Sequence, residues 1–148
     1  MLSGLPKKNY ESGENSKEVT GVYDLSVFKN ILQQEKARTA FNPGRTFFGK
    51  VTVVDAQLNG LSWKEKMILR DEIARELKSY LKDYDKVTAV SAGEFYFLKL
   101  ESNPEKIETL EELIIFNLEA LVKSNVKDSK VEVSVRTQTV VHNETIEL

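Results

Sequence analysis

The chain has 148 residues, of which 41% are hydrophobic and 30% charged, a size and composition that fit one globular domain and exclude a disordered chain. A formal net charge of −2 argues against nucleic acid or an anionic membrane as a partner, and the absence of cysteine excludes disulfides and thiolate metal sites. The longest apolar runs, such as residues 113–116, are too short to span a bilayer, and residues 1–16 carry no signal-peptide core. We therefore expect a cytoplasmic protein that is not inserted into a membrane.

The first predicted element follows a polar segment at the start of the chain. Residues 1–18 are rich in polar side chains and are expected to form a flexible leader, with a single domain over residues 19–148. A helix is predicted over residues 25–37, and the turn sequence at 42–44 ends it. Its apolar residues recur on one helical face: Leu25, Phe28, Ile31 and Leu32.

A strand and a second helix are predicted next. Residues 46–54 are nearly continuous in apolar and β-branched residues, which favours a central strand covered on at least one face. Ser62 and Glu65 form the pattern of a capping box at the start of a helix over residues 63–83. The apolar stripe of this helix is expected to comprise Trp63, Met67, Ala74, Leu77 and Leu81, with Trp63 in or beside the core.

Two short strands, 86–91 and 94–100, are predicted to form a hairpin whose turn reads Ser-Ala-Gly-Glu. Val87, Ala89, Phe95, Phe97 and Leu100 are expected to supply its apolar faces.

A third helix is predicted to begin at Asn103-Pro104 and to end near Asn125, because proline is tolerated in a first helical turn. Its core face would comprise Ile107, Leu110, Ile114, Leu118 and Leu121. Ile115 and Phe116 lie beside that face and would form an apolar contact patch if exposed.

The last predicted strand covers residues 130–137, where Val131, Val133 and Val135 alternate with polar residues. The tail over residues 139–148 is expected to add a weak edge strand or to fray.

The predicted order is helix, strand, helix, strand, strand, helix, strand. This order favours an α+β fold of ferredoxin-like kind, in which helices pack on one face of a mixed, mainly antiparallel sheet.

Several strings at matching spacings resemble the GGDEF family of diguanylate cyclases. Residues 19–24, Val-Thr-Gly-Val-Tyr-Asp, are similar to the Leu-Thr-Gly-Leu-x-Asn string of that family. The turn over residues 91–95, Ser-Ala-Gly-Glu-Phe, stands where the family has Gly-Gly-Asp/Glu-Glu-Phe, and residues 133–135 resemble its Val-Ser-Ile stretch. The resemblance spans residues 19–137 and implies the nucleotidyl-cyclase-like fold of GGDEF domains.

The resemblance also implies where an active site would lie. The family joins two GTP molecules into cyclic di-GMP with the help of divalent metal ions, which take oxygen ligands. The matching metal positions are Asp55, after the first long strand, and Gly93, which has no side chain to bind a metal. Ser91 and Ala92 replace the two glycines that let the family's backbone approach the nucleotide. Glu94 is retained but is expected to be solvated.

Two further positions depart from the family pattern. Met67 stands where the family has a guanine-contacting aspartate, and a thioether cannot accept hydrogen bonds from guanine as a carboxylate can. Lys82 and Asp85 match the Arg-x-x-Asp of the family's product-inhibition site, but lysine lacks the planar guanidinium fork. The family's last helix is also missing, so we expect a piece of a longer protein or a shortened domain.

These departures predict a catalytically inactive, degenerate GGDEF-like domain that acts in signalling through protein–protein interaction, without cofactor or metal. Its partner would be another signalling protein or a second copy. The alternatives are a receptor that binds GTP or cyclic di-GMP weakly without turnover, an active cyclase using Asp55 and Glu94, and an unrelated ferredoxin-like RNA-binding domain. The lone His142 has no neighbouring motif that would place it in a catalytic or metal site.

Overall fold

The computed structural model describes residues 22–41 and 45–148 of the chain. The predicted leader at residues 1–18, the first half of the family-like string at 19–24 and the turn at 42–44 therefore lie outside the described residues.

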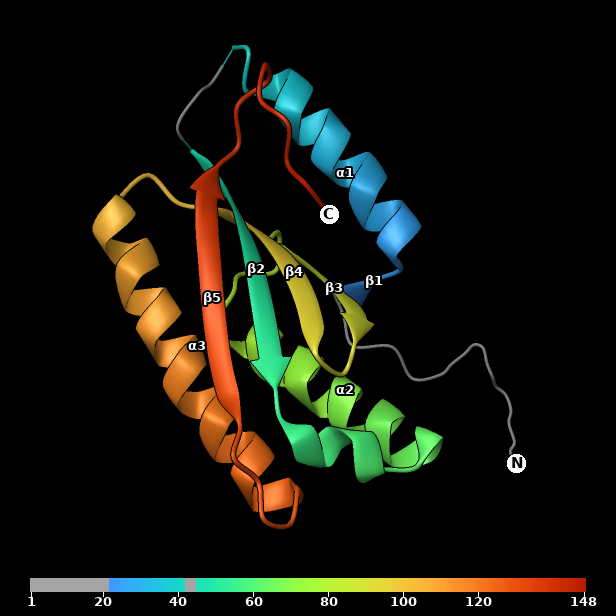
Figure 1. Ribbon diagram of the computed structural model, residues 1–148. Coiled ribbons are helices and arrows are strands. Elements are labelled where there is room, and N and C mark those ends of the chain that lie inside the picture. Colours follow the sequence, from blue (N-terminus) through green and yellow to red (C-terminus); the bar gives the residue numbers. More distant parts are fainter. Residues whose placement is uncertain (1–21, 42–44) are drawn as a thin grey trace.

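The elements follow the predicted order, with a short strand added at the start and a 3-10 helix added before the second helix (Figure 1). In chain order they are β1 (Val22–Tyr23), α1 (Leu25–Arg38), β2 (Thr46–Val54), the 3-10 helix η1 (Ala56–Gly60), α2 (Trp63–Ser79), β3 (Lys86–Ser91), β4 (Glu94–Leu100), α3 (Pro104–Asn125) and β5 (Glu132–Thr139). The strands form one five-stranded sheet in the order β1-β3-β4-β2-β5. Only β1 and β3 run parallel; every other pair is antiparallel. The prediction of a mixed, mainly antiparallel α+β fold is confirmed.

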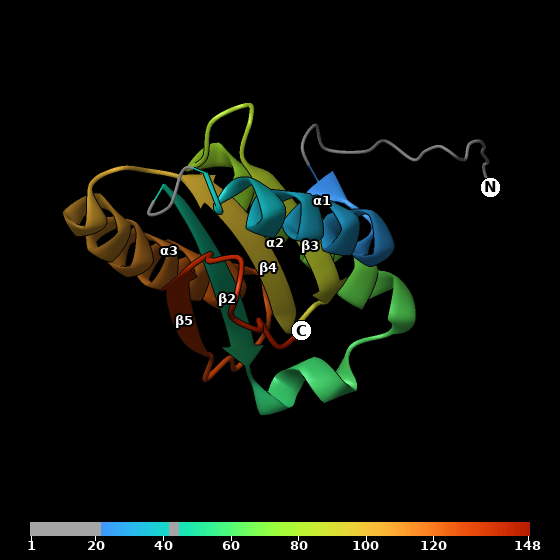
Figure 2. The same cartoon turned by 90° about the horizontal axis from the view of Figure 1, so that it is seen from above.

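The helices cover both faces of the sheet, so the expectation that they pack on one face is wrong. α2 and α3 pack on one face with the larger apolar core, and α1 packs on the other (Figures 1 and 2). Strand β4 has apolar side chains on both faces of the sheet, so both faces must be packed against other elements. Phe95 and Phe97 point to the α2–α3 face, whereas Tyr96 and Leu98 point to the α1 face, and all four are buried.

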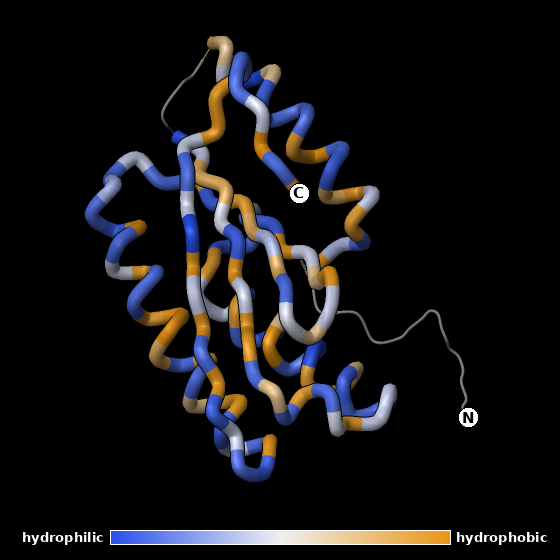
Figure 3. Tube along the Cα trace, in the orientation of Figure 1, coloured by the Kyte–Doolittle hydropathy of each residue, from blue (hydrophilic) through white to orange (hydrophobic). Residues whose placement is uncertain are grey.

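The α1 face is closed by the tail, which was expected to form an edge strand or to fray. After β5, Val140 is fully buried and packs with Phe28 and Leu32 of α1, and its amide donates to the carbonyl of Thr46. Figure 3 shows this apolar stretch of the chain between α1 and the sheet. The tail is therefore part of the second core.

A glycine in β2 makes room for Phe97, one of the two phenylalanines buried in the main core. Gly49 lies opposite Phe97 in the β2–β4 ladder, and a β-carbon at position 49 would lie 2.1 Å from Cζ of the Phe97 ring. The aromatic ring thus covers the glycine, a pairing that stabilises glycine within strands.

The second helix differs from its prediction in its C-terminal end and in the residues that it buries. It ends at Ser79 rather than residue 83, and Trp63 at its start is 75% exposed rather than in or beside the core. Leu69 and Ile73 fill the core instead, together with the predicted Ala74 and Leu77. The predicted stripe starts too early, at Trp63 in the first helical turn, whereas the buried residues of α2 start at Leu69.

Candidate functional site

The signature-like turn connects β3 and β4 and packs against the end of β2. Ser91 pairs with Glu94, so Ala92 and Gly93 form the tip. The carbonyl of Gly93 accepts a hydrogen bond from the Val53 amide at 2.9 Å, and a β-carbon at position 93 would lie 3.0 Å from the Val53 carbonyl oxygen. The hydroxyl of Ser91 accepts from the Gly93 amide at 3.1 Å. The turn is thus held to β2 by backbone contact, with no carboxylate at its third position.

Glu94 is tied to side chains of the sheet rather than fully solvated. The phenol of Tyr96 donates to its carboxylate at 2.6 Å, and the Lys50 ammonium lies 3.6 Å away on the neighbouring strand. Burial, helped by the hydrogen bond to Glu94, raises the pKa of Tyr96 to about 12. Glu94 therefore faces the α1 side of the sheet, together with the second core.

Asp55 follows β2 and is buried, with both carboxylate oxygens engaged. Oδ1 caps η1 by accepting from the Gln57 amide at 3.0 Å and lies 3.5 Å from the Lys130 amide; Oδ2 accepts from the Ser129 hydroxyl at 2.6 Å. The Ser129 hydrogen bond is the main reason that the pKa of Asp55 lies below its usual value. Asp55 thereby joins the end of β2 to the α3–β5 connection.

The structure brings Asp55 and the signature-like turn to the same end of the sheet, through the contact of Gly93 with Val53. Within residues 22–41 and 45–148, no group of three or more acidic or histidine side chains could hold a metal ion. The half-exposed Met67 is on α2, and His142 is an exposed tail residue.

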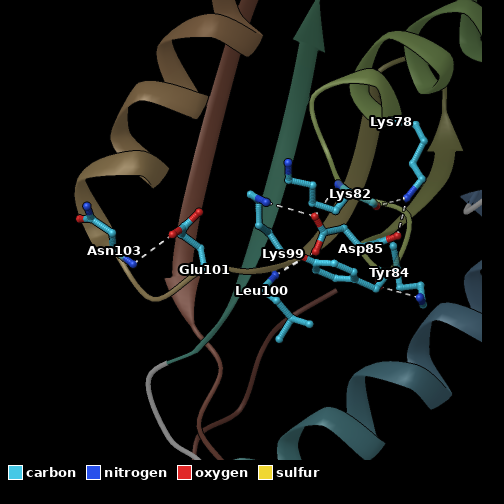
Figure 4. A network of polar contacts seen from close by, with 9 residues as sticks. Lys78, Lys82, Tyr84, Asp85, Lys99, Leu100, Glu101 and Asn103 are labelled. Carbon is cyan, nitrogen blue, oxygen red and sulfur yellow. Dashed lines mark hydrogen bonds and ion pairs between the residues drawn. The ribbon is translucent and has the colours of Figure 1, made fainter.

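Lys82 and Asp85 lie at the opposite end of the sheet, in the α2–β3 connection. Asp85 is almost fully buried and accepts from the Lys82 amide at 2.8 Å, the Leu100 amide at 3.0 Å and the Lys99 ammonium at 3.1 Å (Figure 4). The Lys78 ammonium donates to the carbonyl oxygens of Lys82 and Asp85. The Asp85 carboxylate thus organises the connection, whereas the Lys82 side chain is exposed.

The structure also reveals a groove beside Lys82 that the sequence reasoning missed. Arg38, Arg45 and Lys106 join Lys82 there from three separate elements. Their sequence positions share no motif, so only their convergence in the fold identifies the group.

No helix in the described part of the chain is long and apolar enough to cross a bilayer.

Comparisons with known proteins place the fold. No protein-family model and no curated protein matches this sequence. Among solved structures, a DGC protein from Thermotoga maritima is similar with a TM-score of 0.60 at 18% identity, covering 80% of this chain and 82% of that one. The FimX GGDEF domain from Pseudomonas aeruginosa is similar with a TM-score of 0.63 at 12% identity, covering 86% of this chain and 80% of that domain. The chain therefore has the fold of a GGDEF domain, as its sequence resemblance predicted.

Proposed function

We propose that this chain is a non-catalytic, degenerate GGDEF-like domain that acts in cyclic di-GMP-type signalling by binding another protein. The observation that carries the proposal is the engagement of its carboxylates near the signature-like turn. Asp55 stabilises a chain connection, Glu94 pairs with Tyr96 and Lys50, and position 93 has no side chain.

A cyclase needs carboxylate oxygens that are available to bind a metal ion, and the carboxylates near this turn are engaged in other contacts. Phosphate-transferring sites hold Mg²⁺ through carboxylates with oxygens free for the metal, and the metal neutralises charge on the phosphates. A metal at Asp55 would compete with the Ser129 hydroxyl for Oδ2 and with the Gln57 amide for Oδ1. Breaking these bonds would leave buried polar groups unpaired, at a cost of about 1–3 kcal/mol each.

The outer face of α3 supports a role in protein binding. Phe116 is 73% exposed and Leu113 is 43% exposed, one helical turn apart, whereas the neighbouring Ile115 packs partly against the core. Exposed aromatic and aliphatic side chains of this kind are common in contact surfaces. Glu108 and Glu112 are exposed on the same helix, so the partner surface should combine apolar contacts with basic side chains.

A photo-crosslinking amino acid at position 116, introduced into the full chain in cells of its source organism, tests this surface. Trp63 is the matched control position because it is equally aromatic and 75% exposed but lies at the start of α2. We expect one protein to crosslink at position 116 and not at position 63. The purified partner should bind the wild-type chain and bind Phe116→Ser at least about tenfold more weakly, since interface aromatics contribute roughly 1–2 kcal/mol or more.

The same yield at both positions, no crosslinked protein at 116, or unchanged affinity of Phe116→Ser would overturn the proposed surface. The exposure of Phe116 means that its replacement should leave the fold unchanged, which a thermal melt would verify.

A further inference from the structure

Strand β5 lies at one end of the sheet, so one of its edges pairs with β2 and the other pairs with no strand in the described part of the chain (Figure 1). It has eight residues, whereas β1 at the opposite end of the sheet has two. Proteins usually shorten or cover such an edge, because its row of unpaired N–H and C=O groups can pair with another extended chain. The free edge of β5 is therefore a candidate site for strand addition.

The ladder between β2 and β5 identifies the residues whose backbone groups face this edge. Val133 stands opposite Val53, whose amide donates instead to the Gly93 carbonyl. The Val133 amide donates to the Glu119 carboxylate at 3.1 Å. This pair therefore exchanges no hydrogen bonds, and in an antiparallel ladder such pairs alternate with hydrogen-bonded ones. Every second residue after Val133 must likewise turn its N–H and C=O groups outward: Val135, Thr137 and Thr139.

Only the first of these outward-facing amides has a partner within residues 22–41 and 45–148. Glu119 accepts from Val133, whereas the contact of Thr137 with Glu111 uses the threonine hydroxyl and leaves its amide free. No side chain in the same ranges bonds the amides of Val135 and Thr139. Three consecutive outward-facing residues thus offer donors and acceptors to an extended backbone, as in proteins that bind a peptide by strand addition.

The helix beside this edge determines which chain would fit there. Glu111 and Glu119 of α3 reach β5 through the contacts described above. Glu108, three residues before Glu111, and Glu112, seven residues before Glu119, lie on the same side of the helix. None of the four carboxylates forms an ion pair with a described Lys or Arg. Negative charge therefore flanks the free edge on its α3 side.

This charge favours a basic partner over a second copy of the chain. Antiparallel pairing of two β5 edges about a twofold axis would place both α3 helices on the same side of the joined sheet, with their glutamates facing one another. Like charges in such positions are destabilising. Lys or Arg side chains on an added strand would instead lie opposite these glutamates.

We infer that the free edge of β5 binds an extended segment of a partner protein, which joins the sheet as a further strand and carries Lys or Arg at every second position. The basic side chains lie over the glutamates of α3, and the backbone pairs with Val135, Thr137 and Thr139. The inference rests on the proposed protein contact at Phe116, four residues from Glu112 on the same helix, and specifies the form of the partner.

A short synthetic peptide of Lys-Thr repeats, as long as β5, tests the strand addition when titrated into the full isotope-labelled chain and followed by NMR. We expect saturable binding that shifts the amide signals of Val135, Thr137 and Thr139 and slows their hydrogen exchange, because the peptide carbonyls become their acceptors. Added salt should weaken the binding, since exposed charges are screened.

Two control peptides separate backbone pairing from charge. N-methylation of every amide keeps the charges of the Lys-Thr peptide but removes the donors that pair with a strand. This peptide should bind at least about tenfold more weakly, because several hydrogen bonds are lost. A Glu-Thr peptide of the same length keeps the donors but meets the glutamates of α3, so it should also bind more weakly.

Variants of the chain test the acidic side of the edge. Glu108→Gln and Glu112→Gln should each weaken binding of the Lys-Thr peptide about two- to fivefold, the contribution of one exposed ion pair. Both side chains are exposed, so the fold should persist. Asp83→Asn is the matched control, because Asp83 is an exposed carboxylate in the α2–β3 connection, away from β5.

Absence of saturable binding, equal affinity for the N-methylated peptide, or an equal loss in Asp83→Asn would overturn the inference. So would a dimer of the chain alone in analytical ultracentrifugation that protects the Val135, Thr137 and Thr139 amides from exchange, because the edge would then bind a second copy. Peptide binding without a crosslink at position 116 would overturn the contact at Phe116 alone. A crosslink without peptide binding would overturn strand addition alone.

Discussion

Replacing Asp55 distinguishes a structural carboxylate from a metal ligand. In the structure, Asp55→Ala removes the cap on η1, worth about 1 kcal/mol, and the charge-assisted bond from Ser129, worth about 1.5–3 kcal/mol. The Lys130 amide at 3.5 Å adds little. We therefore expect a loss of about 3 kcal/mol in the free energy of unfolding, measured by urea denaturation with metal absent.

The loss of stability caused by Ser129→Ala should depend on pH. The Ser129 hydroxyl lowers the pKa of Asp55 below the ordinary value of an aspartate, so its stabilisation is present above that ordinary pKa and is lost as the pH falls through the folded-state pKa. Ser129→Ala should therefore be less stable than wild type by about 1–2 kcal/mol at neutral pH, and the difference should shrink below about pH 4. A stability of Asp55→Ala within about 0.5 kcal/mol of wild type would refute the structural role, since that is the range of neutral surface substitutions.

Three further predictions concern the core and its buried polar groups. Gly49→Ala should cost about 3 kcal/mol by urea denaturation, because the new β-carbon would meet the Phe97 ring at 2.1 Å; an unchanged midpoint would contradict this packing. Asp85→Ala should cost about 3–5 kcal/mol, since it leaves the Lys99 ammonium buried without its partner, and a loss below about 1 kcal/mol would count against the ion pair. The raised pKa of Tyr96 stabilises the fold fully below pH 10, and this stabilisation is lost as the pH rises through about 12. Wild type and Tyr96→Phe would be titrated and followed by ultraviolet absorbance, and the difference between the two curves should show one phenol ionising near pH 12 and not near pH 10.

Much of the fold is predictable from local sequence patterns. Phe28 and Leu32 of α1, and Ile107, Leu110, Ile114 and Leu118 of α3, are buried as their helical spacing predicts. The hairpin is also found where its turn sequence predicts it, with Val87, Phe95 and Phe97 fully buried. The apolar residues of these elements recur with a clear period. The period alone therefore identifies the buried face, whatever packs against it.

The structural predictions fail where tertiary contacts determine whether a segment forms a strand or is buried. Strand β1 has only two residues and exists through its parallel pairing with β3, so it has no periodic signal of its own. Val140 is buried because α1 and the sheet meet over the tail, which the polar residues around it do not reveal. The arrangement of helices on two faces follows from the continuous apolar run of β4, whose Tyr96 and Leu98 the sequence reasoning did not assign to a core.

In the candidate site, too, local sequence predicts some features and tertiary contacts determine the others. Positions 91–95 could be placed in a β-turn from their residue types. Asp55, however, contacts Ser129 of a distant segment, and Glu94 contacts Lys50 of the neighbouring strand. The groove beside Lys82 is the extreme case, because its residues come from α1, β4, α3 and the connections between elements, and no spacing rule connects them.

The absence of cyclase chemistry is the central claim, and turnover of GTP tests it most directly. The purified full chain would be incubated with GTP and either Mg²⁺ or Mn²⁺, with pyrophosphate and cyclic dinucleotide measured beside an active GGDEF protein. We expect neither product above the protein-free blank, because no free carboxylate at the signature-like turn is available to hold the metal. Formation of the cyclic dinucleotide by the wild-type chain, abolished in Asp55→Ala, would contradict the account.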